Sequence, residues 1–201
     1  MKKKIDILIG THNKGKFKEL SSLLSKKLKK ISPVTLRIKS PRENGKTFLA
    51  NSKLKAKYFY RNSKILSLSD DSGLSVDCLN GRPGILSARF AKKNGGFTKA
   101  MKKIIKEVKD KNKNRKNKNL KAEFVCSLSI YGKTGKFINA VGKIKGTISK
   151  KIAGDNGFGF DPIFIPNNQK LTFGQMRKRK KMRMDHRFVA YKKLKKKINF
   201  L

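Results

Sequence analysis

Two adjacent carboxylates, Asp70 and Asp71, directly follow an apolar segment at residues 65–68. The chain has only 12 acidic residues against 53 lysines and arginines, so a paired acid beside a buried strand is unusual. Carboxylates can bind Mg²⁺ and activate a water molecule for attack on phosphorus. The alternative is that these residues have a structural role, in which an aspartate caps a neighbouring element and Ser72 lies in a turn. The residues themselves leave both interpretations open.

A second polar segment separates a predicted strand at 5–9 from a predicted helix. It consists of Thr11, His12, Asn13, Lys14, Gly15 and Lys16. The N–H groups of a helix N-terminus, together with lysines, suit a chain of phosphates. The segment lacks the GxxxxGK[ST] pattern of a P-loop, and an ordinary polar turn is the alternative.

Residues 157–162 alternate glycine with aromatic residues and continue into an acid. The rings of Phe158 and Phe160 could stack on a nucleobase, and Asp161 could accept one of its N–H groups. The alternative is packing of the two rings in the core, which is the commoner role of aromatic residues.

A fourth candidate group combines Lys181 with the adjacent pair His186-Arg187. These side chains can donate hydrogen bonds to the carbonyl oxygens of a base. The alternative is polar surface at the start of a helix.

These residues need a framework, and the spacing of apolar residues predicts one. Strands are expected at 5–9, 34–38 and 65–68, helices at 17–28, 48–60 and 97–108, an antiparallel strand pair at 124–131 and 137–148, and a basic amphipathic helix within 185–201. Thr47 is a candidate N-cap, 110–120 is a polar low-complexity loop, and 154–166 is a glycine- and aromatic-rich loop. Strands mixed with helices predict an α/β fold with a mixed β-sheet and flanking helices.

The composition is strongly basic, with a net charge of +41, but 37% of residues are hydrophobic and can form a core. Such a charge attracts polyanions, so weak, non-specific polyanion binding is expected. We favour lysine enrichment of solvated faces over a dedicated nucleic-acid function, because the lysines are spread along the whole chain. Cys78 and Cys126 are expected to be buried thiols. The apolar segment 5–9 is too short for a secretory segment or a membrane span, which predicts a cytoplasmic protein with no membrane partner.

Taken in order, these segments closely resemble the inosine triphosphate pyrophosphatase family, which removes non-standard purine triphosphates. The matching segments are THNKGKFKEL (11–20), TFLANSKLKAK (47–57), SDDSGLSVDCLNGRPGILSARFA (69–91), FVCSLSI (124–130), GFGFDPIF (157–164) and DHR (185–187). The resemblance extends from about residue 5 to about residue 190, and the block at 69–91 is its most specific part.

The resemblance implies two lobes around a central nucleotide-binding cleft, within a single domain spanning 1–201 that is usually a homodimer. It implies Mg²⁺-dependent hydrolysis of ITP, dITP or XTP to the monophosphate and pyrophosphate. Roles carried over by position are a triphosphate loop (Thr11, His12, Asn13, Lys14, Gly15, Lys16), a phosphate contact (Lys55), a general base and metal ligand (Asp71), a substrate contact (Ser72) and a base pocket (Phe158, Gly159, Phe160, Asp161, Lys181, His186, Arg187).

The chain departs from the family pattern at three single positions and in the stretch 177–180, which is basic where acids are common. An acidic position of the family falls on Arg42, which leaves Glu43 as the candidate second metal ligand. His12 replaces a glycine, and Asp185 replaces a serine before the His-Arg pair. Two rival functions remain, a basic nucleic-acid-binding protein and a pyrophosphatase of related fold for modified pyrimidines. The intact order of motifs argues against the first, and the His-Arg pair with the 157–161 loop argues against the second.

Overall fold

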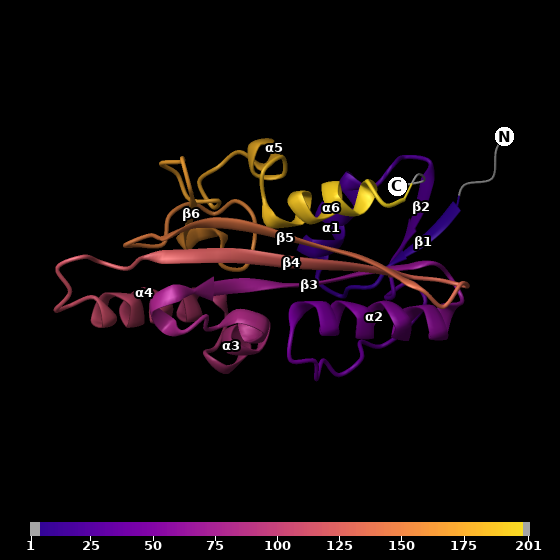
Figure 1. Ribbon diagram of the computed structural model, residues 1–201, viewed down its shortest axis with the longest axis horizontal. Helices are drawn as coiled ribbons and strands as arrows, with labels where there is room; N and C mark the ends of the chain where they lie inside the picture. The colour runs from indigo at the N-terminus through magenta and orange to yellow at the C-terminus, as the bar shows by residue number, and fades with distance from the viewer. Residues whose placement is uncertain (1–4, 199–201) are drawn as a thin grey trace. The chain divides into compact units, whose positions relative to one another are not determined.

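The computed structural model describes residues 5–198, which contain one six-stranded sheet in the order β2-β1-β3-β4-β5-β6 (Figure 1). The strands are β1 (Ile5–Ile9), β2 (Leu28–Ile31), β3 (Ser67–Val76), β4 (Lys121–Tyr131), β5 (Phe137–Ile148) and β6 (Phe164–Pro166). The helices are α1 (Lys14–Leu23), α2 (Phe48–Ser63), α3 (Ser87–Lys93), α4 (Phe97–Lys111), α5 (Lys178–Lys181) and α6 (His186–Lys195). β1 is parallel to β2 and β3, whereas β6 is antiparallel to β5. The predicted α/β fold with a mixed sheet and flanking helices is confirmed.

The chain divides into two compact units. Among the described residues, unit 1 comprises 5–71, 126–142 and 187–198, and unit 2 comprises 72–125 and 143–186. Each unit has its own core of buried apolar side chains. Because fully burying one such side chain contributes about 1.5–3 kcal/mol, each unit gains substantial stability from its own core.

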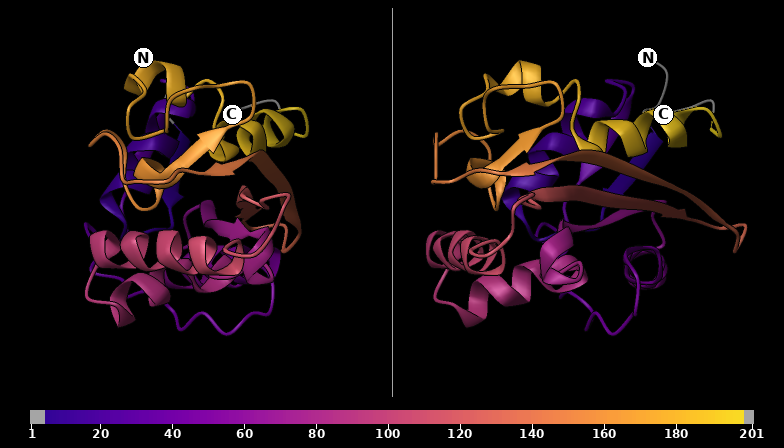
Figure 2. Two further views of the ribbon diagram at one scale, coloured as in Figure 1. Left: turned by 90° about the vertical axis from the view of Figure 1, so that its left-hand side faces the viewer. Right: turned by 60° about the vertical axis from the view of Figure 1, so that its left-hand side comes forward.

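Unit 1 is built around β1, whose residues Ile7, Leu8 and Ile9 are completely buried. Helices α1 and α6 lie on one face of this part of the sheet, and α2 lies on the other (Figures 1 and 2). Both α1 and α2 begin at a side-chain cap. Asn13 Oδ1 accepts a hydrogen bond from Lys16 N (2.9 Å), and Thr47 Oγ1 accepts one from Ala50 N (3.0 Å).

Because Thr47 fixes the start of α2, its removal should weaken the whole helix. Thr47→Ala is expected to lower the free energy of unfolding by about 1 kcal/mol, the usual value of an N-cap. Urea denaturation checks this. Thr98→Ala, at an exposed position in α4, is the matched control and should change stability much less. Equal effects of the two variants would contradict the capping role.

Two expectations about the region after α1 are wrong. Leu28 was predicted to belong to the first helix, but it starts β2 and pairs in register with Ile5. The strand expected at 34–38 is a turn, in which Ile38 N donates to the carbonyl of Pro33 (3.0 Å) and Val34 is 62% exposed. Residues 34–38 have no neighbouring strand to pair with, so an extended conformation would not stabilise them. Leu28, in contrast, becomes buried beside β1 when it forms a strand.

Other elements follow the predictions with shifted bounds. The helices predicted at 48–60 and 97–108 and the strands at 124–131 and 137–148 are present as α2, α4, β4 and β5. The polar loop at 110–120 starts two residues later, because 110 and 111 belong to α4, and the loop at 154–166 contains β6. The helix predicted over 185–201 is α6, but it ends at Lys195, so the expectation for 196–198 is wrong; residues 199–201 lie outside the described residues.

Unit 2 packs α3 and α4 on one face of its part of the sheet and the 157–185 segment on the other (Figure 2). Gly73 permits close packing here, because a Cβ would collide with the carbonyl oxygen of Gly84 and with Ser87 Oγ. Cys126 is buried as expected, but Cys78 is only half-buried. Between residues 5 and 198, no helix is long and apolar enough to cross a membrane.

Candidate functional site

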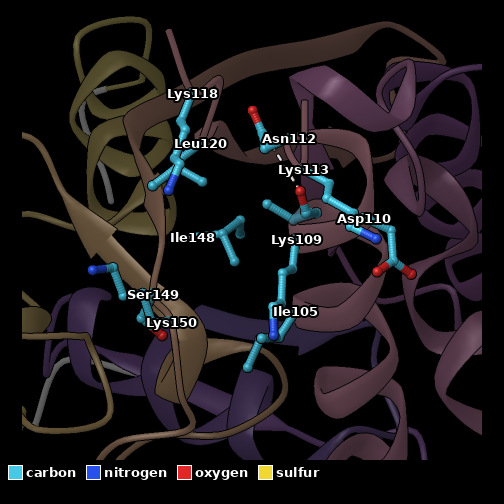
Figure 3. A pocket seen from close by; sticks show the side chains of 11 residues that line it. Ile105, Lys109, Asp110, Asn112, Lys113, Lys118, Leu120, Ile148, Ser149 and Lys150 are labelled. Atoms are coloured by element: carbon cyan, nitrogen blue, oxygen red, sulfur yellow. Dashed lines mark hydrogen bonds between the residues drawn. The ribbon is translucent and has the colours of Figure 1, made fainter. Parts of the chain in front are cut away.

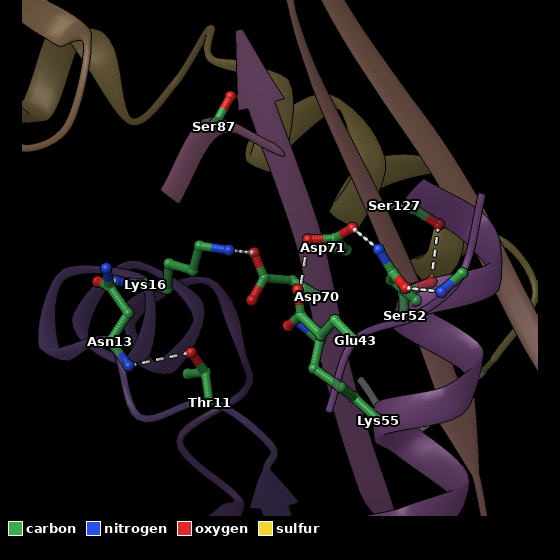
Figure 4. Close-up of polar contacts among 12 residues, drawn as sticks. Thr11, Asn13, Lys16, Glu43, Ser52, Lys55, Asp70, Asp71, Ser87 and Ser127 are labelled. Carbon is green, nitrogen blue, oxygen red and sulfur yellow. Dashed lines mark hydrogen bonds and ion pairs between the residues drawn. The ribbon is translucent and has the colours of Figure 1, made fainter. Parts of the chain in front are cut away.

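Asp70 and Asp71 lie in the interior of β3, not at the end of a strand as the sequence predicted. Successive side chains of a strand point to opposite faces of the sheet. Figure 4 shows Asp70 directed toward Lys16 of α1, whereas Asp71 is directed toward α2. The two carboxylates therefore do not converge on one ion but serve two different polar clusters.

The first cluster of unit 1 surrounds Asp70, which is completely buried. Lys16 Nζ lies 3.1 Å from Asp70 Oδ2, and Arg187 Nη2 lies 3.5 Å from the same oxygen. Arg187 Nη1 also donates to the Glu19 carboxylate. Burial alone would raise the pKa of Asp70, but the charges of Lys16 and Arg187 outweigh it and hold that pKa well below its usual range. Asp70 is therefore a permanent anion that orders cations from α1 and α6.

The second cluster surrounds Asp71, which is 4% exposed. Asn51 Nδ2 of α2 donates to Asp71 Oδ2 (3.0 Å), and Lys55 Nζ lies 3.8 Å from Asp71 Oδ1. Burial raises the pKa of Asp71 to about 6, although the ammonium groups of Lys55 and Lys16 act in the opposite direction. A buried carboxyl group fixed by an amide and titrating near neutrality has the properties of a general base.

Glu43 joins this second cluster through Lys55, whose Nζ lies 2.6 Å from Glu43 Oε1. Burial would lower the pKa of Lys55, but the carboxylates of Asp70, Asp71 and Glu43 outweigh it and raise that pKa, so Lys55 stays cationic. The neighbouring Arg42 is exposed. Glu43 is therefore linked to Asp71 through the ammonium group of Lys55.

The donor set fits Mg²⁺ chemically, because Asp71 and Glu43 supply hard carboxylate oxygens, both within 4 Å of Lys55 Nζ. Within residues 5–198, no group of three or more His, Cys, Asp or Glu side chains could hold a metal. The two carboxylates can therefore hold an ion only with further ligands such as substrate phosphates and water. Mg²⁺ commonly binds in this way.

The polar segment at residues 11–16 forms the turn into α1 and its first residues. Thr11 is buried, and its Oγ1 accepts from Asn13 N (3.2 Å). His12 Nδ1 is hydrogen-bonded to Ser40 Oγ (2.6 Å). Lys14, Gly15 and Lys16 already belong to α1, so their N–H groups lie in its first turn, where intrahelical acceptors are lacking. This arrangement suits an anion at the helix N-terminus.

The polar residues predicted in unit 2 form a third cluster. Asp161 Oδ2 accepts from Phe158 N (2.9 Å) and from Lys181 Nζ (2.7 Å). Lys181 is 2% exposed, and its Nζ lies 5.1 Å from the centre of the half-buried Phe158 ring and 3.9 Å from Asp185 Oδ2. Gly157 has a φ of +79°, and a Cβ there would strike the Asp161 carboxylate. The loop therefore holds Phe158 in one fixed position.

Five other candidates of the base pocket and its surroundings take different places. Phe160 lies in the core, with its ring edge-on to Phe97 at 5.2 Å, as the packing alternative predicted. His186 is buried and stacks on Phe124 at 4.7 Å. Gly159 and Ser72 are half-buried. Arg187, the neighbour of His186, makes its ion pairs in unit 1.

Sequence reasoning missed two residues that order these clusters, Asn51 and Glu19. Asn51 is four residues before Lys55 on α2, so both side chains share a helix face, and this spacing could have revealed it. Glu19 stands three residues after Lys16 on α1 and is one of only 12 acids in the chain. The scarcity of acidic residues, which makes Asp70 stand out in the sequence, applies equally to Glu19 and could have revealed it.

Comparisons with known proteins agree with this geometry. The model of the Ham1 family matches residues 7–197. A dITP/XTP pyrophosphatase of Haemophilus influenzae is 37% identical over 201 residues, covering 98% of this chain and 100% of that protein. One from Caulobacter vibrioides is 36% identical over 189 residues, covering 94% and 95%.

Solved structures agree as well. A HAM1 protein from Coxiella burnetii superposes with a TM-score of 0.85 at 27% identity, covering 96% of this chain and 97% of that one. The Staphylococcus aureus Ham1 protein gives a TM-score of 0.79 at 31% identity, covering 95% and 96%. The match extends over nearly the whole length of each protein and includes the segments that carry the clusters. This chain belongs to the Ham1 family.

Proposed function

We propose that this chain hydrolyses non-standard purine nucleoside triphosphates such as ITP, dITP and XTP to the nucleoside monophosphate and pyrophosphate. The observation that carries the proposal is Asp71, a buried carboxylate fixed by Asn51 and placed beside Lys55. Such a group can accept a proton from a water molecule that attacks the α-phosphorus. The relatives named dITP/XTP pyrophosphatase support the substrate class.

The phosphates require positive charge and N–H donors, and unit 1 provides both. The N-terminal turn of α1, from Thr11 to Lys16, would wrap the triphosphate, with His12 and Asn13 at its edge. Lys55 would contact a phosphate from α2 while remaining close to Asp71. Ser72, the next residue on β3, would make a further substrate contact. Preorganised cations stabilise the charge that develops as the anhydride bond breaks.

We infer that Mg²⁺ is the cofactor and binds through Asp71 and Glu43. When bound, it would supply charge neutralisation of the phosphates. Arg42 cannot ligate a cation, because a guanidinium stays protonated. Two protein carboxylates are too few for a tight site by themselves, so we expect the ion to bind together with the nucleotide.

For the base we propose Phe158, Gly159, Asp161, Lys181 and His186. The half-buried Phe158 ring offers a stacking surface, and the Asp161–Lys181 pair fixes the loop that carries it. Phe160 and Arg187 would act through packing and ion pairing. A 6-oxo purine offers an acceptor to buried donors, whereas the 6-amino group of adenine would leave such donors unpaired, which is costly.

Such a pocket is expected to prefer 6-oxo purines strongly over adenine. The ratio of kcat/KM for ITP to that for ATP is expected to be about a hundredfold or more, as for sites that hydrogen-bond a discriminating group. Pyrophosphate release from a panel of ITP, dITP, XTP and ATP measures it. The Asp71→Asn protein, purified identically, controls for contaminating enzymes. Equal kcat/KM for ITP and ATP would contradict the proposed base pocket.

We also propose how the chain is organised, where it acts and what else it binds. The full chain would act as one pyrophosphatase domain that forms a homodimer, with a cleft for the nucleotide. It would act in the cytoplasm, on the nucleotide pool. The net charge of +41 favours weak, salt-sensitive binding to polyanions.

A further inference from the structure

Unit 2 contains a pocket of about 710 Å³ that shares no lining residue with the candidate site (Figure 3). Side chains of α4 and the residues after it form one wall, and Leu120 with residues 148–150 forms the opposite wall. The complete lining is Ile105, Val108, Lys109, Asp110, Asn112, Lys113, Lys118, Leu120, Ile148, Ser149 and Lys150. The volume lies in the range of pockets that hold small organic ligands.

The walls of this pocket are fixed by Asn112, which is 3% exposed. Asn112 Nδ2 donates to the carbonyls of Val108 (2.7 Å) and Asn119 (3.1 Å), and Asn112 Oδ1 accepts from Asn119 N (2.6 Å). Ile148 N donates to the carbonyl of Leu120 (2.9 Å). The 112–120 loop is thus tied to both α4 and β5, so the pocket is preformed and does not depend on a ligand for its shape.

The rim of the pocket is strongly positive. Its lysines are Lys109, Lys113, Lys118 and Lys150, all exposed. Within residues 5–198 none of the four forms an ion pair, whereas the only acid of the rim, Asp110, is paired with Lys106 at 2.8 Å. Ammonium groups gathered around a concave surface favour an anion, and lysine binds phosphates and carboxylates as a mobile point charge.

The floor of the pocket is aliphatic. Ile105, Val108, Leu120 and Ile148 contribute it, and no aromatic side chain belongs to the lining. The polar groups deep in the walls are already engaged, because Asn112 makes the bonds above and Ser149 Oγ donates to the carbonyl of Lys151 (2.5 Å). Below its lysine rim, the pocket therefore lacks an aromatic stacking surface and free donors for reading a nucleobase, but it suits an alkyl chain.

We propose that this pocket binds a single-chain anionic amphiphile, with its phosphate or carboxylate head among the four lysines and its alkyl chain against the aliphatic floor. The two halves of the ligand correspond to the two halves of the pocket. A nucleotide fits less well, because its base would meet neither stacking partners nor free hydrogen-bonding groups. The site is independent of the proposed catalytic function, since Asp71 and its partners take no part in it.

The probe is octyl phosphate, used as monomers, with binding followed by calorimetry and by the methyl NMR signals of the floor residues. We expect saturable binding that shifts the signals of Ile105, Val108, Leu120 and Ile148. Lys113→Gln/Lys118→Gln should weaken binding by about fivefold or more, since each exposed ion pair contributes up to about 1 kcal/mol. Lys102→Gln/Lys111→Gln removes the same charge from exposed positions of α4 outside the lining and should leave binding unchanged.

Several outcomes would overturn the proposal. Equal weakening by the two double variants would show that only the net charge matters. If inorganic phosphate bound as tightly as octyl phosphate, the aliphatic floor would not contribute to binding. If octyl glucoside bound as tightly as octyl phosphate, the lysines would not contribute. Binding to phosphatidic acid vesicles without binding of octyl phosphate would indicate a membrane surface in place of a single molecule in the pocket.

Discussion

Replacing Asp71 with asparagine is expected to lower kcat for ITP by about a hundredfold or more, the usual loss when a general base is removed. The fold should survive, because asparagine has the same shape and its amide oxygen can still accept from Asn51 Nδ2. What disappears is the basic oxygen that takes the proton from water, together with one negative charge beside Lys55. Steady-state pyrophosphate release, with circular dichroism of the same sample, measures both properties.

The matched control is Asp110→Asn, which removes the same charge from an exposed residue of α4 that is paired with Lys106. Its activity should equal that of the wild type. If Asp71→Asn retained wild-type turnover while remaining folded, Asp71 would not be the base, and the function of β3 would have to be reassigned.

The second large effect concerns stability. Arg187→Met should lower the free energy of unfolding by about 3–5 kcal/mol, the cost of breaking a buried ion pair from one side. Arg187 is 1% exposed and neutralises both Glu19 and the completely buried Asp70. Methionine fills similar space but removes the guanidinium that neutralises both buried carboxylates. In a chain of this size the melting temperature should fall by roughly 10 °C.

Arg183→Met is the control, since Arg183 is exposed and lies four residues before Arg187. It should change stability by no more than about 0.5 kcal/mol, as is usual for surface positions. Calorimetry or urea denaturation compares the two. If Arg187→Met matched the wild type in stability, the ion pairs would not stabilise unit 1, and a direct contact with substrate would become the better explanation for this arginine.

Most of the framework could be predicted because its elements carry local signals. The apolar run at 5–9, the Thr47 cap and the apolar periodicity of 97–108 are each readable in the sequence, and all three elements formed. The segment 28–31 could not be predicted, because LKKI becomes a strand only through pairing with β1. Tertiary context also left 34–38 as a turn, although its β-branched residues favour extension.

The candidate residues could be identified by type, but their partners could not. Asp70 and Asp71 are adjacent in the sequence and were predicted to share one site. Only the structure shows that Asp70 faces α1 and Asp71 faces α2. Phe158 and Phe160 look equivalent in the motif, yet Phe160 packs on Phe97 in the core. Long-range ion pairs such as Glu19–Arg187 join residues 168 positions apart, and no local pattern reveals them.

The most direct test of the central claim is the identity of the products. Phosphorus NMR of ITP or XTP incubated with the protein and Mg²⁺ should show the monophosphate and pyrophosphate appearing in equal amounts, without diphosphate or orthophosphate as early products. That result would place cleavage between the α- and β-phosphorus atoms. Appearance of nucleoside diphosphate with orthophosphate, or no turnover of either nucleotide, would contradict the proposed pyrophosphatase activity.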